Sequence, residues 1–115
     1  MNQPDTAVLR AKYRALVIEW DEARDQPKIA NRLFDALHAF YKEIRETDAG
    51  REAILGLLVD PMVAVQLSAA THSLLWKPAE AVAVLQDIEK GGNLYSVDAK
   101  WTLRSFRNGK LNLNW

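Results

Sequence analysis

The chain has 115 residues, of which 49% are hydrophobic, and its 15 Lys and Arg residues balance 15 Asp and Glu residues to a formal net charge of zero. This length suits one domain with its own core, so we expect residues 1–115 to form a single domain. The balanced charge disfavours nucleic-acid binding and membrane-surface binding, which usually need a basic excess. The chain has no cysteine, which excludes disulfides, thiolate metal sites and cysteine nucleophiles.

The sequence also lacks the signals of a membrane or exported protein. No apolar run approaches the ~18 residues that a transmembrane helix needs. The N-terminal sequence MNQPDTAVLR lacks the basic and apolar segments of a signal peptide. We therefore expect a soluble, cytoplasmic protein without a membrane partner.

Two amphipathic helices are predicted in the first part of the chain. One covers about residues 6–24 and the other about residues 28–46, and the sequence Asp25-Gln26-Pro27 separates them. In both segments apolar residues recur at helical spacing. The second helix has the more regular apolar stripe, which consists of Ile29, Leu33, Leu37, Phe40 and Ile44. Residues 47–50 are interpreted as a short turn, and a third, shorter helix follows and ends before residue 60.

The sequence Asp60-Pro61 predicts the start of a central helix that runs to Trp76. The Asp carboxylate can accept hydrogen bonds from the first backbone N–H groups of a helix, and proline suits the first helical position. Apolar residues occupy more than one face of this segment, and its body has no Asp, Glu, Lys or Arg. We therefore expect the helix to be buried on two or more sides, with Ala69 and Ala70 allowing close approach of its neighbours.

Two further helices are predicted in the last part of the chain. The fifth covers residues 78–90, after a break at Lys77-Pro78, and Gly91-Gly92 ends it. Ser96 can cap the sixth, which Gly109 ends, and residues 110–115 form a tail. The inward stripe of the sixth helix is expected to be Ala99, Leu103 and Phe106, widened by Val97 and by Trp101 or Thr102.

No segment has the alternation or the hairpin dipeptides of β-strands. The predicted fold class is therefore all-α, with about six helices stacked as antiparallel hairpins, because the connections are short. Apolar positions of the central helix also align with those of its neighbours at steps of about 32 to 36 residues, within the range of helical solenoid repeats.

Two runs resemble known helical families. The run LLVDPMVAVQLSAATHSL resembles a HEAT-type repeat, with Val65-Gln66 at the place of the usual Val-Arg pair, so the ladder ion pair of regular HEAT arrays would be missing. The pattern SxDAxxTLxxxxxG resembles a small bacterial domain-of-unknown-function family with an armadillo/HEAT-like fold; it is formed by Ser96, Asp98, Ala99, Thr102, Leu103 and Gly109. The resemblance covers about residues 54–111. It implies an α-α superhelix and no activity, because that family offers no catalytic residues to transfer.

Candidate metal ligands and catalytic groups are few. Asp35 and His38 lie three residues apart, and His72 is the only other histidine. Such a set falls short of the three or four ligands with fixed geometry that a metal site needs, so histidines at helix interfaces are the favoured interpretation. The acidic residues 19–25 are interleaved with apolar and basic ones, and a solvated helix end is favoured over a cation site. Hydroxyl residues beside His72 share its helix, which disfavours a catalytic triad. We expect no enzyme activity, no cofactor and no metal.

Four basic residues share one side of the sixth helix. Lys100, Arg104, Arg107 and Lys110 follow at spacings of four, three and three residues. Favourable interaction with the C-terminal end of the helix is the favoured explanation, given the zero net charge. The alternative is a site for a partner or an anion. Because the segment 43–60 is net acidic, the two could also pair between copies of the chain in a homo-oligomer.

The leading hypothesis for function is a non-enzymatic protein-interaction domain, a HEAT-like scaffold that binds a protein or peptide. One alternative is an immunity or antitoxin-like protein that binds a cognate toxin. Another is a nucleic-acid-binding HEAT-like module, against which the zero net charge speaks. The sequence leaves the identity of the partner and the oligomeric state open.

Overall fold

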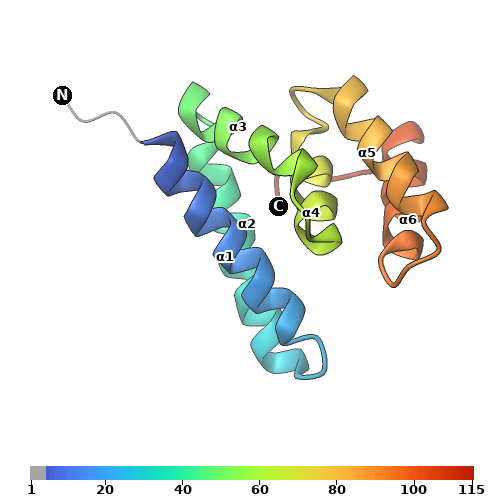
Figure 1. The fold of residues 1–115 in the computed structure, drawn as a ribbon, viewed down its shortest axis with the longest axis horizontal. Helices are drawn as coiled ribbons and strands as arrows, with labels where there is room; N and C mark the ends of the chain where they lie inside the picture. The colour runs from blue at the N-terminus through green and yellow to red at the C-terminus, as the bar shows by residue number, and fades with distance from the viewer. Residues whose placement is uncertain (1–4) are drawn as a thin grey trace. The chain divides into compact units, whose positions relative to one another are not determined.

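The computed structural model describes residues 5–115, which form helices joined by short connections and contain no strand (Figure 1). Within these residues the α-helices are α1 (Thr6–Glu22), α2 (Pro27–Ile44), α3 (Asp48–Leu55), α4 (Val63–Ser73), α5 (Pro78–Lys90) and α6 (Ser96–Arg107). A 3-10 helix, η1 (Gly56–Val59), follows α3. The prediction of an all-α chain with six helices is confirmed. The chain divides into two compact units between Leu57 and Leu58, so that α1, α2 and α3 belong to the first unit and α4, α5 and α6 to the second.

In the first unit, α1 packs against both α2 and α3. All three helices contribute side chains that are shielded from solvent, namely Tyr13, Val17, Leu37, Phe40, Ile44, Ala53 and Ile54. The apolar stripe predicted for α2 is buried only in its second half. Ile29 is exposed and Leu33 is half-buried, so the first turns of α2 lie at the rim of the unit.

Arg10 joins α1 to the end of α3. Its Nε donates to the carbonyl oxygen of Ala53 and its Nη2 donates to that of Glu52, both at 3.0 Å. These carbonyls lie in the last turn of α3, where helix geometry leaves acceptors in need of partners. A Cβ atom placed on Gly56 would lie 2.4 Å from the guanidinium carbon of Arg10, so the glycine leaves room for this contact.

The prediction of a turn over residues 47–50 is wrong, because α3 already begins at Asp48. Thr47 is the N-cap of the helix: its Oγ1 accepts from the backbone N–H of Gly50 at 3.0 Å and donates to the carbonyl oxygen of Ile44 at 3.1 Å. A steric constraint therefore explains why residue 50 is a glycine. A Cβ atom on Gly50 would lie 1.8 Å from the Ile44 carbonyl oxygen, so only glycine lets α3 begin so close to the end of α2.

In the second unit, α5 packs against both α4 and α6. Ala69 and Ala70 are buried as predicted, and further buried residues lie all around α4. The predicted bounds of this helix are too wide, because α4 ends at Ser73 and starts only at Val63. Asp60 Oδ2 accepts from the Met62 N–H at 2.9 Å, which forms a tight turn ahead of the helix in place of a cap on it.

The connection between α5 and α6 is fixed by hydrogen bonds. Gly92 has a φ of +63°, which suits glycine at the end of a helix. Ser96, predicted as a cap, is instead the first residue of α6. Its hydroxyl donates to the Ile88 carbonyl oxygen at 2.7 Å and accepts from the Asn93 N–H at 2.9 Å, so one side chain ties α6 to the end of α5. Within residues 5–115, none of the helices combines the length and the apolar character that crossing a membrane requires.

Candidate functional site

The residues weighed as metal ligands do not form a cluster. Asp35 is exposed on α2, whereas His38 is buried and packs its ring against Tyr41 at a centroid distance of 5.4 Å. His72 is buried on α4. Across residues 5–115, no three His, Cys, Asp or Glu side chains are grouped in a way that could hold a metal ion. In the acidic segment 19–25, Asp21 forms an ion pair with Arg24 at 3.3 Å.

Two hydroxyl groups on α4, those of Thr71 and Ser73, are engaged with their own helix. Thr71 Oγ1 donates to the Leu67 carbonyl oxygen at 2.8 Å, and Ser73 Oγ donates to the Ala70 carbonyl oxygen at 3.3 Å. Such bonds are the usual way in which a helix satisfies a Ser or Thr in its interior. The two hydroxyls thus have a structural use in α4.

A buried tyrosine and an arginine form a pair near the end of α2. The Tyr41 side chain has no exposed surface, and Arg45 Nη1 donates to its hydroxyl oxygen at 2.8 Å. The Arg45 guanidinium carbon also lies 4.9 Å from the centre of the tyrosine ring. Burial raises the pKa of Tyr41 above its ordinary value, and the hydrogen bond and positive charge of Arg45 oppose this rise.

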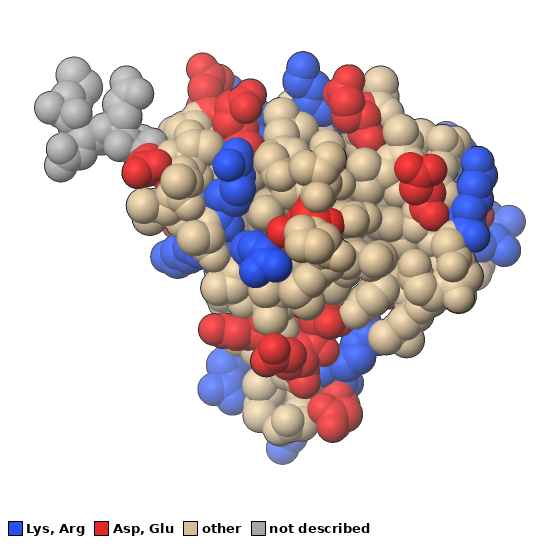
Figure 2. All heavy atoms as spheres, viewed as in Figure 1, with Lys and Arg blue, Asp and Glu red and all other residues tan. Residues whose placement is uncertain are grey.

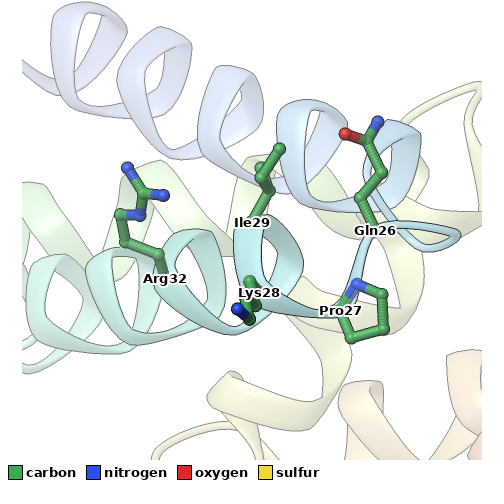
Figure 3. Close-up of a pocket in the computed structure, with 5 residues that line it drawn as sticks. All are labelled: Gln26, Pro27, Lys28, Ile29 and Arg32. Atoms are coloured by element: carbon green, nitrogen blue, oxygen red, sulfur yellow. The ribbon is translucent and has the colours of Figure 1, made fainter.

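A shallow hollow of about 600 Å³ lies at the start of α2 (Figure 3). Its lining consists of Gln26, Pro27, Lys28, Ile29 and Arg32. Figure 3 shows these side chains spread along the first turns of the helix, without convergence on one point. A ligand pocket normally encloses most of its ligand and directs several polar groups at it. This open hollow has neither property.

The four basic residues predicted as a partner or anion site are all exposed in the second unit. Lys100, Arg104 and Arg107 lie on α6, and Lys110 follows the helix in the tail. Gly109, with a φ of +70°, turns the chain between Arg107 and Lys110. The structure therefore places three of the four along one helix. Their role as a binding site stays a prediction.

Exposed apolar side chains lie on the outer face of α6 and in the turn just before it. Leu94 is 66% exposed, Val97 61% and Trp101 53%, although each is large enough to belong in a core. Val97 and Trp101, four residues apart, share one side of α6, and Leu94 lies two residues before the helix begins. We call these three residues the α6 stripe. Single exposed apolar residues are common on protein surfaces, whereas an aligned group of them is a candidate interaction surface.

Arg104 extends the α6 stripe by one further turn. Its guanidinium carbon lies 5.1 Å from the centre of the Trp101 ring, within the range of a cation–π contact. The contact holds a cation directly beside the largest apolar side chain of the stripe. Trp and Arg are two of the side-chain types that contribute most at protein interfaces.

The charges elsewhere on the surface are mixed in sign. On the face drawn in Figure 2, acidic and basic side chains are interspersed, and neither sign forms a continuous field. Over α5 and α6 the same view shows uncharged surface together with acidic and basic side chains. A nucleic-acid-binding face would show a continuous basic field.

The outward orientation of Val97 and Trp101 corrects the sequence analysis. Val97, together with Trp101 or Thr102, was expected to widen the inward stripe of α6, where Ala99 and Leu103 are indeed buried and Thr102 and Phe106 are half-buried. Val97 and Trp101 each lie two residues from Ala99, and at about 100° per residue this places both on the opposite side of the helix. The helical period therefore predicts that Val97 and Trp101 face outward. Their apolar character had instead suggested that they are buried.

Comparisons with known proteins identify a family and a related structure. The sequence model of a family described as "Domain of unknown function (DUF2019)" matches residues 8–107. A solved structure, that of the protein RPA1889 from Rhodopseudomonas palustris CGA009, is similar with a TM-score of 0.85 and 28% sequence identity. The match covers 96% of this chain and 94% of that protein. None of the curated proteins matches the chain.

Proposed function

This chain belongs to the DUF2019 family, and we propose that it is a non-enzymatic interaction domain that binds another protein through the outer face of α6. The observation that carries the proposal is the α6 stripe, in which Leu94, Val97 and Trp101 are each more than half exposed. Burying one such side chain against a partner is worth roughly 1.5–3 kcal/mol when its surface is fully removed from water. A row of them provides an anchor that the folded chain itself does not use.

The inner side of α6 explains why the stripe is available. Ala99 and Leu103 are buried on the side of the helix opposite to Val97 and Trp101. The Ser96 hydroxyl fixes the start of the helix to the end of α5 through the Ile88 carbonyl oxygen. The helix is therefore held in one orientation, and the stripe needs no rearrangement before a partner binds. A surface that is ordered in advance loses less conformational entropy on binding.

A HEAT-like organisation is part of the proposal. The sequential packing of α4 on α5 and of α5 on α6 supports it, because helical repeats build a layer from neighbouring hairpins. Such repeats commonly present helix faces to protein partners. The cytoplasmic location inferred from the sequence stays a prediction.

The proposal is tested by comparing the wild-type chain with two double variants. The first, Val97→Ser with Trp101→Ala, removes most of the α6 stripe. The second, Val59→Ser with Leu75→Ala, removes two exposed apolar side chains, one from η1 and one from the turn after α4, and serves as the matched control. Proteins retained from an extract of the source cells are identified for each tagged full-length chain, and any differential partner is purified.

The expected result is a purified partner that binds the wild type and the control with equal affinity and binds the stripe variant at least tenfold more weakly. Such a loss is expected when a tryptophan anchor worth about 2 kcal/mol is removed. Circular dichroism and thermal unfolding check that the variants stay folded. Equal binding by all three chains would refute the α6 face as the interface. Failure to isolate any differential partner would also count against the proposal.

A further inference from the structure

We infer that the partner of the α6 face is an acidic protein segment with at least one large apolar side chain; this inference rests on the proposed function. The α6 stripe supplies the apolar part of the surface, and the basic residues beside it supply the charge. A partner that matches both parts must combine apolar and carboxylate side chains on one short element.

The charge on this face is strongly one-sided. Lys100, Arg104, Arg107 and Lys110 are all exposed, and Asp98 is the one exposed carboxylate on α6. Four cations against one carboxylate contrast with the zero net charge of the whole chain. Among residues 5–115, none of the four cations is held in an ion pair. They are therefore available to carboxylates from outside.

The cations are also placed on one side of the stripe. At about 100° per residue, Val97, Trp101 and Arg104 fall within about 60° of one another around α6. Lys100 and Arg107 then lie together on one flank of this group, and Asp98 lies on the other flank. A helix or strand that lies along the α6 stripe would meet the side chains of Lys100 and Arg107 along one edge. Carboxylates on that edge of the partner complete the match.

Trp101 and Arg104 define the centre of the site. With the guanidinium carbon 5.1 Å from the ring centre, one approaching segment can place an apolar side chain against the indole and a carboxylate against the guanidinium. Arginine binds carboxylates through two parallel hydrogen bonds, which adds geometric selectivity. This pairing favours Asp or Glu close to the apolar anchor of the partner.

A second copy of the chain that binds through its own α6 fits this face less well. In a two-fold dimer with antiparallel α6 helices, the same flank of each helix faces its counterpart, because the interface uses the same patch twice. Lys100 and Arg107 would then face the same two cations in the other copy. Like charges at such a distance repel, so self-pairing through α6 is disfavoured.

A nucleic acid also fits less well than an acidic protein segment. Leu94 and Val97 are aliphatic and offer no ring on which a base can stack, whereas single-strand binders use aromatic platforms. The exposed Asp98 on the same helix would repel a phosphate backbone. Both competing partners are outcomes of the experiment below.

The experiment selects peptides from a random phage-displayed library on the full-length wild-type chain. Phage that also bind the variant Val97→Ser with Trp101→Ala are removed, so the survivors depend on the α6 stripe. The best survivor is synthesised with a fluorescent label, and its Kd is measured by anisotropy at low and at raised salt. The expected survivors share a large apolar residue with an excess of Asp and Glu.

Two charge-reversal variants with the same change in net charge then separate the effect of the charges beside the α6 stripe from the effect of the net charge of the chain. Lys100→Glu with Arg107→Glu changes the flank of the α6 stripe, and Lys28→Glu with Arg32→Glu changes exposed cations on α2. The first variant is expected to bind the peptide at least tenfold more weakly, and the second within about twofold of the wild type. Raised salt is expected to weaken wild-type binding, because it screens exposed charges.

The outcomes distinguish this inference from the proposed function. Stripe-dependent peptides that are neutral or basic would overturn the acidic partner and leave the α6 face standing as the interface. The absence of any stripe-dependent peptide would refute both. A concentration-dependent dimer that the stripe variant loses would assign the face to a second copy. An oligonucleotide mobility shift lost in Lys100→Glu with Arg107→Glu would assign it to nucleic acid; either of these results overturns the inference.

Discussion

At the scale of single residues, Gly50 shows how one missing side chain decides where a helix can begin. The nearest atoms to an added Cβ are the carbonyl oxygen of Ile44 at 1.8 Å and its carbonyl carbon at 2.5 Å. Both are backbone atoms, which cannot rotate away as a side chain can. The close junction between α2 and α3 therefore depends on glycine at this position, although Gly50 has no positive φ.

Gly50→Ala is expected to lower the free energy of unfolding by about 2–3 kcal/mol, as overpacking of a rigid site does. Gly91→Ala is the matched control, because the nearest atom to its added Cβ is the Asn93 side-chain nitrogen at 3.0 Å and its φ is −69°. The control should change stability by less than about 1 kcal/mol. Urea unfolding followed by circular dichroism measures both. An equal effect of the two substitutions would contradict the junction described here.

Tyr41 makes the free energy of unfolding depend on pH in the alkaline range. Because burial raises the pKa of Tyr41 above the ordinary value of 10.0, the folded chain keeps the phenol proton at a pH where the unfolded chain begins to lose it. The contribution of Tyr41 to the free energy of unfolding is complete below about pH 10, and it declines as pH rises through the pKa of Tyr41 in the folded chain. We expect the wild type to lose stability faster than Tyr41→Phe between about pH 9.5 and 11.

Urea unfolding at a series of pH values, with wild type and Tyr41→Phe compared at each, isolates this contribution from that of the other titrating groups. A second variant tests the opposing role of Arg45. Arg45→Met removes the hydrogen bond and the charge that lower the pKa of Tyr41, so tyrosinate absorbance should appear at higher pH. Parallel stability profiles for wild type and Tyr41→Phe would show that Tyr41 does not titrate differently in the two states.

At the scale of the element, α6 has two apolar sides with opposite uses. Leu103 is buried and Val97 is exposed. Leu103→Ala is expected to cost about 2–5 kcal/mol, because it leaves a cavity. Val97→Ser should change stability by less than about 0.5 kcal/mol, as exposed substitutions usually do. Thermal unfolding of both variants checks the assignment, and a large loss for Val97→Ser would mean that this side of α6 is covered within the folded chain.

The helices themselves could largely be predicted from the sequence, because each has its own periodic signal. The break at Pro27, the start at Pro78 and the end at Gly109 agree with the helices α2, α5 and α6. The failures occurred where one signal has two structural explanations. Asp60-Pro61 can start a helix or form a turn ahead of one, and the hydrogen bond from the Met62 N–H to the Asp60 carboxylate decides for the turn.

The candidate site was predicted only in part, for a related reason. Basic side chains are almost always exposed, so Lys100, Arg104 and Arg107 could be placed on the surface from their chemistry alone. Apolar side chains are found on both sides of a helix, and only packing decides which are covered. Val97, with Trp101 or Thr102, was therefore assigned to the inward side, although their position relative to Ala99 places Val97 and Trp101 outside.

At the scale of the whole molecule, the division after Leu57 leaves two units of fewer than about 60 residues, a size at which a domain is only marginally stable alone. We therefore propose, in line with the single domain predicted from the sequence, that the two units unfold together. This proposal makes a prediction that joins variants from both units.

Gly50→Ala in the first unit and Leu103→Ala in the second should each lower the protection of slowly exchanging amides in both units. Native-state hydrogen exchange, read by mass spectrometry on peptides from each side of Leu57, measures this directly, because amides that exchange only through global unfolding report the same free energy wherever they lie. Gly91→Ala provides the reference for a substitution with little effect. If Gly50→Ala weakened protection only before Leu57, and Leu103→Ala only after it, the units would unfold separately. The chain would then consist of two independently stable parts, each small enough to depend on a bound partner for further stability.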